Sequence, residues 1–147
     1  MMRRRTTMRL FCRLTRLPTP FGGIFKLATK LAEESTYGNF RHGAVLIKSG
    51  AVQSIAFNTD KYCSRGAKYR PEEKGHATYH AEIRAILGVP YHITKNCTIY
   101  VARVNKHGES RISRPCDMCQ SVLESQGVKK AIYTFDENHY GIMKIGD

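Results

Sequence analysis

The stretch HAEIRAIL, residues 80–87, decides how the rest of the chain is interpreted. Side chains three or four residues apart share one face of a helix, so His80 and Glu82, only two apart, are expected to point in different directions. Both can serve one site if His80 lies at the first turn and the helix begins at that site. His80 then binds what lies in front of the helix, and Glu82 reaches it from the side.

A second stretch, PCDMC at residues 115–119, supplies the partners that His80 needs. Cys116 and Cys119 are three residues apart and share a helical face, so they can bind one ion together. The partial positive charge at a helix N-terminus lowers the pKa of a thiol and favours the thiolate that a metal requires. One imidazole and two thiolates suit Zn²⁺. Three protein ligands leave the fourth position open, as in catalytic rather than structural zinc sites.

The combined pattern H-x-E…P-C-x-x-C gives Glu82 a role other than metal ligation. Zinc lowers the pKa of a water at its open position to roughly 7. A carboxylate beside that water can move its proton to a substrate, so Glu82 is the predicted general acid and base. The same signature occurs in the zinc deaminases of nucleobases. We therefore predict His80, Cys116 and Cys119 as metal ligands and Glu82 as the catalytic residue.

From about residue 24 to residue 135, the chain resembles the cytidine and deoxycytidylate deaminase superfamily. The resemblance is carried by HAEIRAI (80–86), by SRPCDMCQSVLESQGVKKAIYT (113–134) and, less specifically, by RHGAVLIKSGAVQSIAFN (41–58). It implies a three-layer sandwich of α/β or mixed α+β class, in which a five-stranded mixed sheet has helices on both faces. It also implies two substrate contacts. The Asn58 side chain would hydrogen-bond the substrate sugar, and the backbone N–H of Ala81 would hold the base carbonyl. Asn58 could instead be a turn residue, since Asn favours turns.

Hydrophobic periodicity and turn residues predict the elements around these motifs. The predicted helices cover 24–36, 78–87 and 115–126. The predicted strands are 43–48, 51–57, 97–104, 128–135 and 140–145. The order α-β-β-α-β-α-β-β is typical of a sheet with helices packed on its faces. Because the turn 136–139 is short, we expect the last two strands to be antiparallel.

Length and composition favour one globular domain. The chain has 147 residues, of which 41% are apolar and 10% aromatic, enough for a single core. No apolar run approaches the ~20 residues of a membrane span, so no membrane association is expected. Five cysteines without a secretory apolar segment favour a reducing compartment, and we expect a cytoplasmic protein. Residues 21–147 are assigned to the deaminase domain, and the resemblance implies a homo-oligomer.

Residues 1–20 are assigned to a basic, disordered N-terminal segment. They carry six arginines and no acidic residue, so they contribute half of the net charge of +12. Three interpretations stay open. The segment is a disordered tail or an overlong start with Met8 as the initiator, an arm that contacts nucleic acid, or an Arg-rich organellar transit peptide.

Two other metal arrangements are compatible with the sequence. The cysteine pair could belong to a structural zinc with another cysteine as the fourth ligand, although Glu82 would then have no role. The candidates are Cys12, Cys63 and Cys97. A second zinc could use His76 and Cys63, which flank the catalytic helix, because some deoxycytidylate deaminases carry one nearby. The remaining histidines are interpreted as surface or locally bonded residues: His42, His92, His107 and His139.

Three functions are compatible with the motifs. The first is a deaminase of a free cytosine nucleotide, converting dCMP to dUMP, or of a close nucleoside analogue. The second is a deaminase of cytosine or adenosine within single-stranded DNA or tRNA. The third is a binding module that keeps the zinc without the chemistry, and Glu82 argues against it.

Several features bear on the choice of substrate. Cations near the catalytic helix could bind a substrate phosphate or simply be solvated. They are Arg65, Lys68, Arg70, Lys74, Arg111 and Arg114. A single-strand binder needs stacking aromatics, for which the best candidates are Tyr62, Tyr69 and Tyr79. An antiparallel final pair of strands resembles the enzymes of free nucleosides. We therefore expect a small cytosine nucleotide as the partner, with the basic N-terminal segment as the alternative route to nucleic acid.

Overall fold

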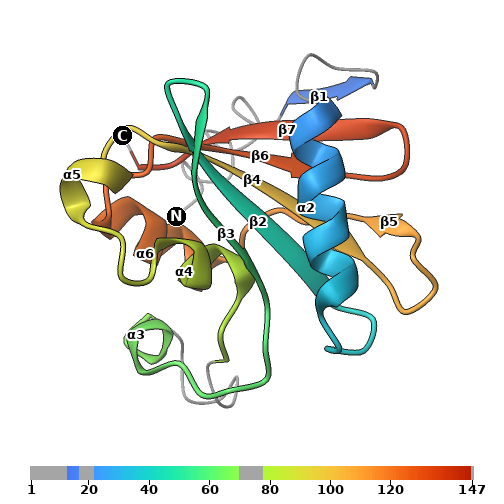
Figure 1. Ribbon diagram of the computed structural model, residues 1–147, viewed down its shortest axis with the longest axis horizontal. Coiled ribbons are helices and arrows are strands. Elements are labelled where there is room, and N and C mark those ends of the chain that lie inside the picture. The colour runs from blue at the N-terminus through green and yellow to red at the C-terminus, as the bar shows by residue number, and fades with distance from the viewer. Residues whose placement is uncertain (1–12, 17–21, 70–77, 147) are drawn as a thin grey trace, which may run out of the picture.

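The protein is a three-layer sandwich in the computed structural model. A sheet forms the middle layer, with helix α2 (Gly22–Glu34) on one face and helices α4 (Ala81–Ile86) and α6 (Asp117–Ser125) on the other (Figure 1). This confirms the predicted class, a mixed α/β fold with helices on both faces. None of the described helices has the length and apolar character that a membrane crossing needs. The structure describes residues 13–16, 22–69 and 78–146.

The five expected strands are present and lie in the order β7-β6-β4-β2-β3. Their bounds are β2 (Arg41–Lys48), β3 (Ala51–Phe57), β4 (Thr98–Val104), β6 (Lys130–Thr134) and β7 (His139–Lys144). β2 and β3 form the predicted hairpin, and β4 runs parallel to β6 because α6 returns the chain between them. β6 and β7 are antiparallel, which confirms the prediction from the short turn.

Two further strands correct the expectation of five to a sheet of seven. β1 (Arg13–Arg16) belongs to the basic N-terminal segment and pairs with β7, and β5 (Ser110–Arg111) pairs with the end of β4. Strands of four and two residues are too short to give a recognisable alternation of apolar and polar residues. Apart from β1, the segment 1–20 lies outside the described residues.

The helix predicted over 78–87 is shorter in the structure and begins at Ala81. Residues 78–80 are extended because they lie beside the segment that follows β3. The backbone N–H of Thr59 donates to the carbonyl of Tyr79 at 2.9 Å. The other predicted elements match within two residues at each end. Two single-turn helices, α3 (Ser64–Ala67) and α5 (Tyr91–Thr94), occupy stretches where no element was predicted.

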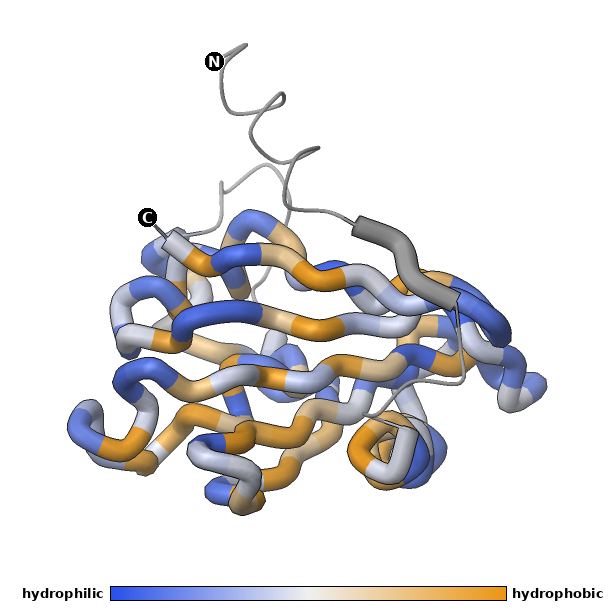
Figure 2. Tube along the Cα trace, turned by 90° about the horizontal axis from the view of Figure 1, so that it is seen from above, coloured by the Kyte–Doolittle hydropathy of each residue, from blue (hydrophilic) through white to orange (hydrophobic). Residues whose placement is uncertain are grey.

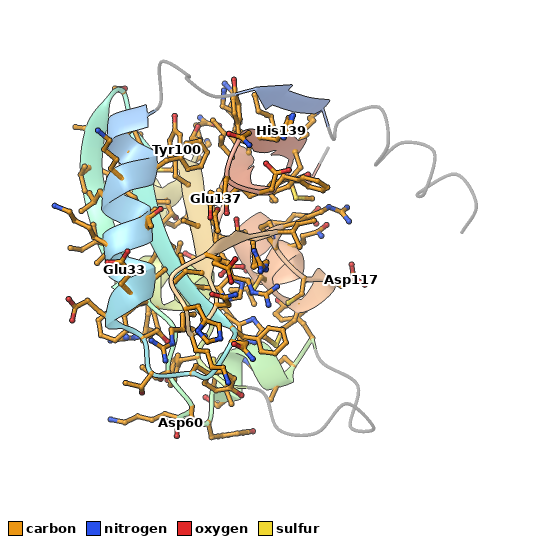
Figure 3. The ribbon with its side chains drawn as sticks, turned by 90° about the vertical axis from the view of Figure 1, so that its right-hand side faces the viewer. Glu33, Asp60, Tyr100, Asp117, Glu137 and His139 are labelled. Atoms are coloured by element: carbon orange, nitrogen blue, oxygen red, sulfur yellow. The ribbon has the colours of Figure 1, made fainter. Side chains whose placement is uncertain are left out.

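Alternating side chains along the strands build a core on each face of the sheet. Leu46 and Val101 face α4 and α6, whereas their neighbours Val45 and Tyr100 face α2. The ring of Tyr100 meets Phe25 of α2 edge-on, with 5.9 Å between ring centroids, and Tyr100 is labelled beside that helix in Figure 3. Apolar positions recur along the strands in Figure 2, while hydrophilic residues gather at the turns.

Gly43 brings helix α2 and strand β2 into close contact. A Cβ atom at this position would lie 2.0 Å from the carbonyl oxygen of Ala28 and 2.6 Å from the backbone nitrogen of Ala32. Only glycine allows backbone to approach backbone so closely. The first residues of β2 are thereby fixed on the helix, and they lead directly to the candidate site on the opposite face.

Candidate active site

His80 occupies the position that the sequence analysis required. It is the N-cap of α4, with φ −71° and ψ 154°, so its backbone is still extended while the helix begins at the next residue. The pairing of Thr59 with Tyr79 holds this extended approach in place. The imidazole therefore lies in front of the first helical turn, and Glu82 follows inside that turn.

The two cysteines lie at the start of α6, beside His80. Cys116 is the N-cap of α6, and Cys119 is in the first turn. Nδ1 of His80 lies 3.7 Å from Sγ of Cys116 and 3.3 Å from Sγ of Cys119. The three ligand atoms all lie within 4.8 Å of one another. The structure thus brings together residues 36 positions apart, as the motif predicted.

The two thiols have opposite pKa shifts. A hydrogen bond from the Cys119 thiol, helped by His80, lowers the pKa of Cys116 to about 3. Burial is the main cause that raises the pKa of Cys119, and the nearby Cys116 and Glu82 raise it further. The protein alone therefore favours one thiolate with a shared proton. A divalent cation supplies the positive charge that makes both sulfurs thiolates, so this donor set fits zinc.

Glu82 is buried next to this ligand set. Its side chain is 3% exposed and interacts with the thiol of Cys119. Oε1 of Glu82 is one of three buried side-chain oxygen or nitrogen atoms without a hydrogen-bond partner among the described residues. Burial of an unsatisfied carboxylate oxygen costs free energy, which points to a group that acts on a ligand rather than on the fold.

Asn58 is buried, and its amide joins the segment after β3 to the start of β2. Oδ1 accepts a hydrogen bond from the backbone N–H of His42 at 2.8 Å, and Nδ2 donates to the carbonyl of Phe40 at 2.6 Å. The backbone N–H of Asn58 also donates to the carbonyl of His42 at 3.2 Å. Asn58 therefore orders this edge of the site, with one N–H of its amide left over for a ligand.

His42 is a residue that the sequence analysis missed, because it was interpreted as a surface or locally bonded histidine. It is partly buried, and its Nδ1 donates to the carbonyl of Phe40 at 3.1 Å. Burial lowers the pKa of His42, the Glu82 carboxylate acts against this lowering, and His80 adds to it. Glu82 and His80 are therefore close enough to His42 to influence its charge. The alternation of side chains along β2 could have indicated this position, because His42 lies two residues before the buried Ala44 and so shares its face of the strand.

Ser113 fixes the segment that leads into the cysteine helix. Its hydroxyl donates to the carbonyl of Val101 at 2.7 Å and accepts from the backbone N–H of Thr134 at 2.8 Å. The backbone N–H of Ser113 donates to the carbonyl of Thr134, also at 2.8 Å. Ser113 thus joins the ends of β4 and β6, three residues before Cys116.

The cluster of His80, Cys116 and Cys119 is the only group of its kind found among the described residues. Asp117, which lies between the cysteines, is exposed and projects away from the body of the molecule (Figure 3). A three-ligand set matches the open arrangement of a catalytic site rather than the closed one of a structural site.

The other described cysteines have local roles. Cys63 is the N-cap of α3, and its sulfur accepts from the backbone N–H of Gly66 at 3.3 Å. The thiol of Cys97 donates to the carbonyl of Ile93 at 2.9 Å, and burial raises its pKa. Neither joins the metal cluster. The other residues considered as ligands, Cys12 and His76, lie outside the described residues.

The cations considered for a phosphate are only partly described. Arg111 is exposed and lies 3.4 Å from the carboxylate of Glu109. Nε of Arg114 is buried without a hydrogen-bond partner among the described residues, and Lys68 is exposed. Arg70, Lys74 and the side chain of Arg65 lie outside the description.

The tyrosines considered for base stacking do not form one platform. Tyr62 and Tyr69 are exposed, whereas Tyr79 packs against the core on the α4 face. Tyr62 and Tyr69 are therefore the two exposed tyrosines in this region on which a base could stack.

A model of the family described as the cytidine and deoxycytidylate deaminase zinc-binding region matches residues 23–135. The crystal structure of a dCMP deaminase from the cyanophage S-TIM5 in apo form matches with a TM-score of 0.52 and 17% identity, covering 82% of this chain and 86% of that one. The same enzyme in complex with dCMP and dUMP gives 0.51 and 17%, covering 80% and 82%. RibD from Acinetobacter baumannii gives 0.47 and 20%, covering 76% of this chain, which spans only 26% of RibD. No curated protein sequence matches the chain. At these identities the phage enzyme shows the fold.

Proposed function

Because the chain belongs to the family of zinc-binding cytidine and deoxycytidylate deaminases, we propose that it hydrolyses a free cytosine nucleotide, converting dCMP to dUMP with release of ammonia. The observation that carries the proposal is the buried carboxylate of Glu82, with an unsatisfied oxygen, beside a three-ligand set for zinc. A binding module without chemistry has no use for that carboxylate.

Glu82 moves the protons in the proposed reaction. His80, Cys116 and Cys119 would hold the zinc, which would supply the Lewis acidity that makes a water nucleophilic towards C4 of the cytosine. Oε1 of Glu82 takes a proton from the attacking water and delivers it to N3 of the ring. Glu82 then carries the second proton to the exocyclic amino group. The C4–N bond breaks, a carbonyl forms at C4, and ammonia leaves.

Two other residues are proposed to orient the substrate. The unused amide N–H of Asn58 would donate to the sugar, because the other amide groups are engaged by Phe40 and His42. Ala81 is the first residue of α4, and a helix makes no use of the N–H groups in its first turn. That N–H would donate to the carbonyl of the base.

The choice of a free nucleotide is supported by a solved structure of the same fold, which holds dCMP and dUMP. A homo-oligomer and a cytoplasmic location stay predictions. A base within single-stranded DNA or tRNA is the second candidate substrate. It is favoured by the arginines of residues 1–20, of which the structure describes 13–16.

Ultraviolet spectroscopy of the zinc-loaded protein tests the proposal. Cytidine, dCMP and dCTP are supplied separately, and Glu82→Ala is the control. We expect loss of the cytosine band with dCMP and no change in the variant. Turnover of cytidine alone would correct the substrate to a nucleoside. No turnover of all three, with one zinc bound per chain, would overturn the proposal and favour nucleic acid.

A further inference from the structure

We propose that His42 is a substrate-binding residue, whose Nε2 accepts a hydrogen bond from an N–H or O–H group of the cytosine nucleotide. The inference deepens the proposed function and rests on it. The register of β2 determines which face of the sheet the imidazole is on. His42 is two residues from Ala44 and four from Leu46, and both are buried against α4 and α6. Because side chains alternate along a strand, the imidazole faces the side of the sheet that carries the metal ligands.

The position of His42 along the strand brings it to the end of α4 where the site lies. The backbone N–H of His42 donates to Oδ1 of Asn58, and the carbonyl of His42 accepts from the backbone N–H of Asn58. Thr59, which follows Asn58, donates to the carbonyl of Tyr79, directly before His80. The imidazole is therefore on the correct face and at the correct end of the sheet. Its electrostatic interactions with Glu82 and His80 agree with this placement.

The tautomer of His42 follows from its hydrogen bond. Nδ1 faces the carbonyl of Phe40, which only accepts, so the proton of the neutral ring lies on Nδ1 and Nε2 is an acceptor. Among the described residues Nε2 has no hydrogen-bond partner. The His42 residue as a whole is partly buried. An acceptor without a partner, on the face of the sheet that carries the metal ligands, is available to a ligand.

The segment before His42 is held rigidly, which fixes the direction of the ring. The guanidinium of Arg103 donates to the carbonyl of Asn39 at 3.1 Å and lies 4.4 Å from the centre of the Phe40 ring. The carbonyl of Phe40 then accepts from both Asn58 and His42. A binding group that is preorganised in this way loses little conformational entropy when the ligand arrives.

Two substitutions separate the two nitrogens of the ring. His42→Asn places an amide near the position of Nδ1 and can keep the hydrogen bond to Phe40, but nothing replaces Nε2. His42→Gln extends its amide to the position of Nε2. The exposed His107 provides the control His107→Asn. Zinc content is measured for every variant, and only proteins with one zinc per chain are compared.

For dCMP we expect kcat/KM to fall roughly tenfold in His42→Asn and to stay within about threefold of wild type in His42→Gln, as for one lost hydrogen bond. A purely structural role would give the opposite order, since Asn preserves the bond to Phe40. Equal values in both variants, whether lowered or unchanged, would overturn the inference. His107→Asn is expected to match wild type.

Binding of intact dCMP to the Glu82→Gln protein, measured by calorimetry, gives a readout without turnover. His42→Asn in that background should weaken binding by a similar factor, and the absence of any weakening would overturn the inference. If binding responds in this way while the wild-type protein releases no ammonia, the deaminase proposal fails and the contact stands. Repeating the comparison with 2′,3′-dideoxycytidine monophosphate identifies the donor. An effect of His42→Asn that disappears assigns a sugar hydroxyl, and one that persists assigns the amino group.

Discussion

Glu82 combines burial, a charge and an unsatisfied oxygen in one side chain. Replacing it by the isosteric Glu82→Gln removes the charge and the proton acceptor but keeps the shape. We expect kcat for the cytosine nucleotide to fall by about 10²–10⁴, the usual contribution of a positioned general acid and base. Urea denaturation should show an equal or higher free energy of unfolding, because a buried charge is removed. Retention of more than a tenth of kcat would contradict the role of Glu82.

His42 gives the fold a dependence on pH. Burial lowers its pKa against the opposing influence of Glu82, and the nearby His80 and Arg103 lower it further. Between this lowered value and about 6.5, the unfolded chain binds the proton more readily than the folded protein. The contribution of His42 to the free energy of unfolding should therefore be fully present above pH 6.5. It should be lost as the pH drops towards the pKa of His42 in the folded protein. Urea titrations of metal-free wild type and His42→Gln from pH 8 to 5 test this, and the variant should lose less.

The cluster of His80, Cys116 and Cys119, with Glu82 buried beside it, could be predicted from the sequence because the spacing of these residues reflects the proposed chemistry. H-x-E and C-x-x-C specify donors within one helical turn each, and zinc ligation then joins the two turns. His42 and Ser113 were not predicted, because each acts through a register between strands. A single sequence shows which residues alternate, but it does not show which atoms of another strand they face.

At the scale of elements, the hydroxyl of Ser113 joins the ends of β4 and β6 directly before the cysteine helix. We expect Ser113→Ala to lower the free energy of unfolding by about 1–3 kcal/mol, because the carbonyl of Val101 and the N–H of Thr134 lose a buried partner. Zinc affinity should fall as well, since Cys116 follows the loosened segment. Urea denaturation and competition with a zinc chelator measure the two effects.

Ser125 offers a matched control for that variant. Its hydroxyl donates to the carbonyl of Val122 at 2.6 Å, within α6 and away from the metal ligands. Ser125→Ala removes a hydroxyl that also bonds a carbonyl, but it should leave zinc affinity unchanged. Equal losses of zinc affinity in both variants would show that Ser113 has no special influence on Cys116.

The helices and strands with a clear period were predicted within two residues, apart from α4. Its predicted start was wrong because residues 78–80 are held extended by a distant segment, and local propensity does not report such pairing. The short elements α3, α5, β1 and β5 span four residues or fewer. Segments of that length hold at most two repeats of the strand pattern or about one turn of helix, too few to distinguish the two, so tertiary contacts decide them.

At the scale of the whole molecule, a zinc held by His80, Cys116 and Cys119 would join two segments that precede and follow β4 in the chain and lie on the same face of the sheet. We expect one zinc per chain. At a free zinc concentration a hundred times the dissociation constant, binding adds about 2.7 kcal/mol to the free energy of unfolding. For a protein of this size that raises the melting temperature by about 5–10 °C. Differential scanning calorimetry with and without a chelator measures the shift, and a normal shift in Cys116→Ala would contradict the ligand assignment.

The contact at Gly43 has a consequence for variation at this position. In a library with all twenty amino acids there, selection for folded protein should return glycine alone, because even one methyl group would overlap the backbone of Ala28. The same library at Gly23, where a Cβ meets nothing within 4 Å, should return many residues. A relative that carries a larger residue at the position of Gly43 must hold its first helix elsewhere. The residue at this one position would then indicate whether helix α2 can lie as close to the sheet as it does here.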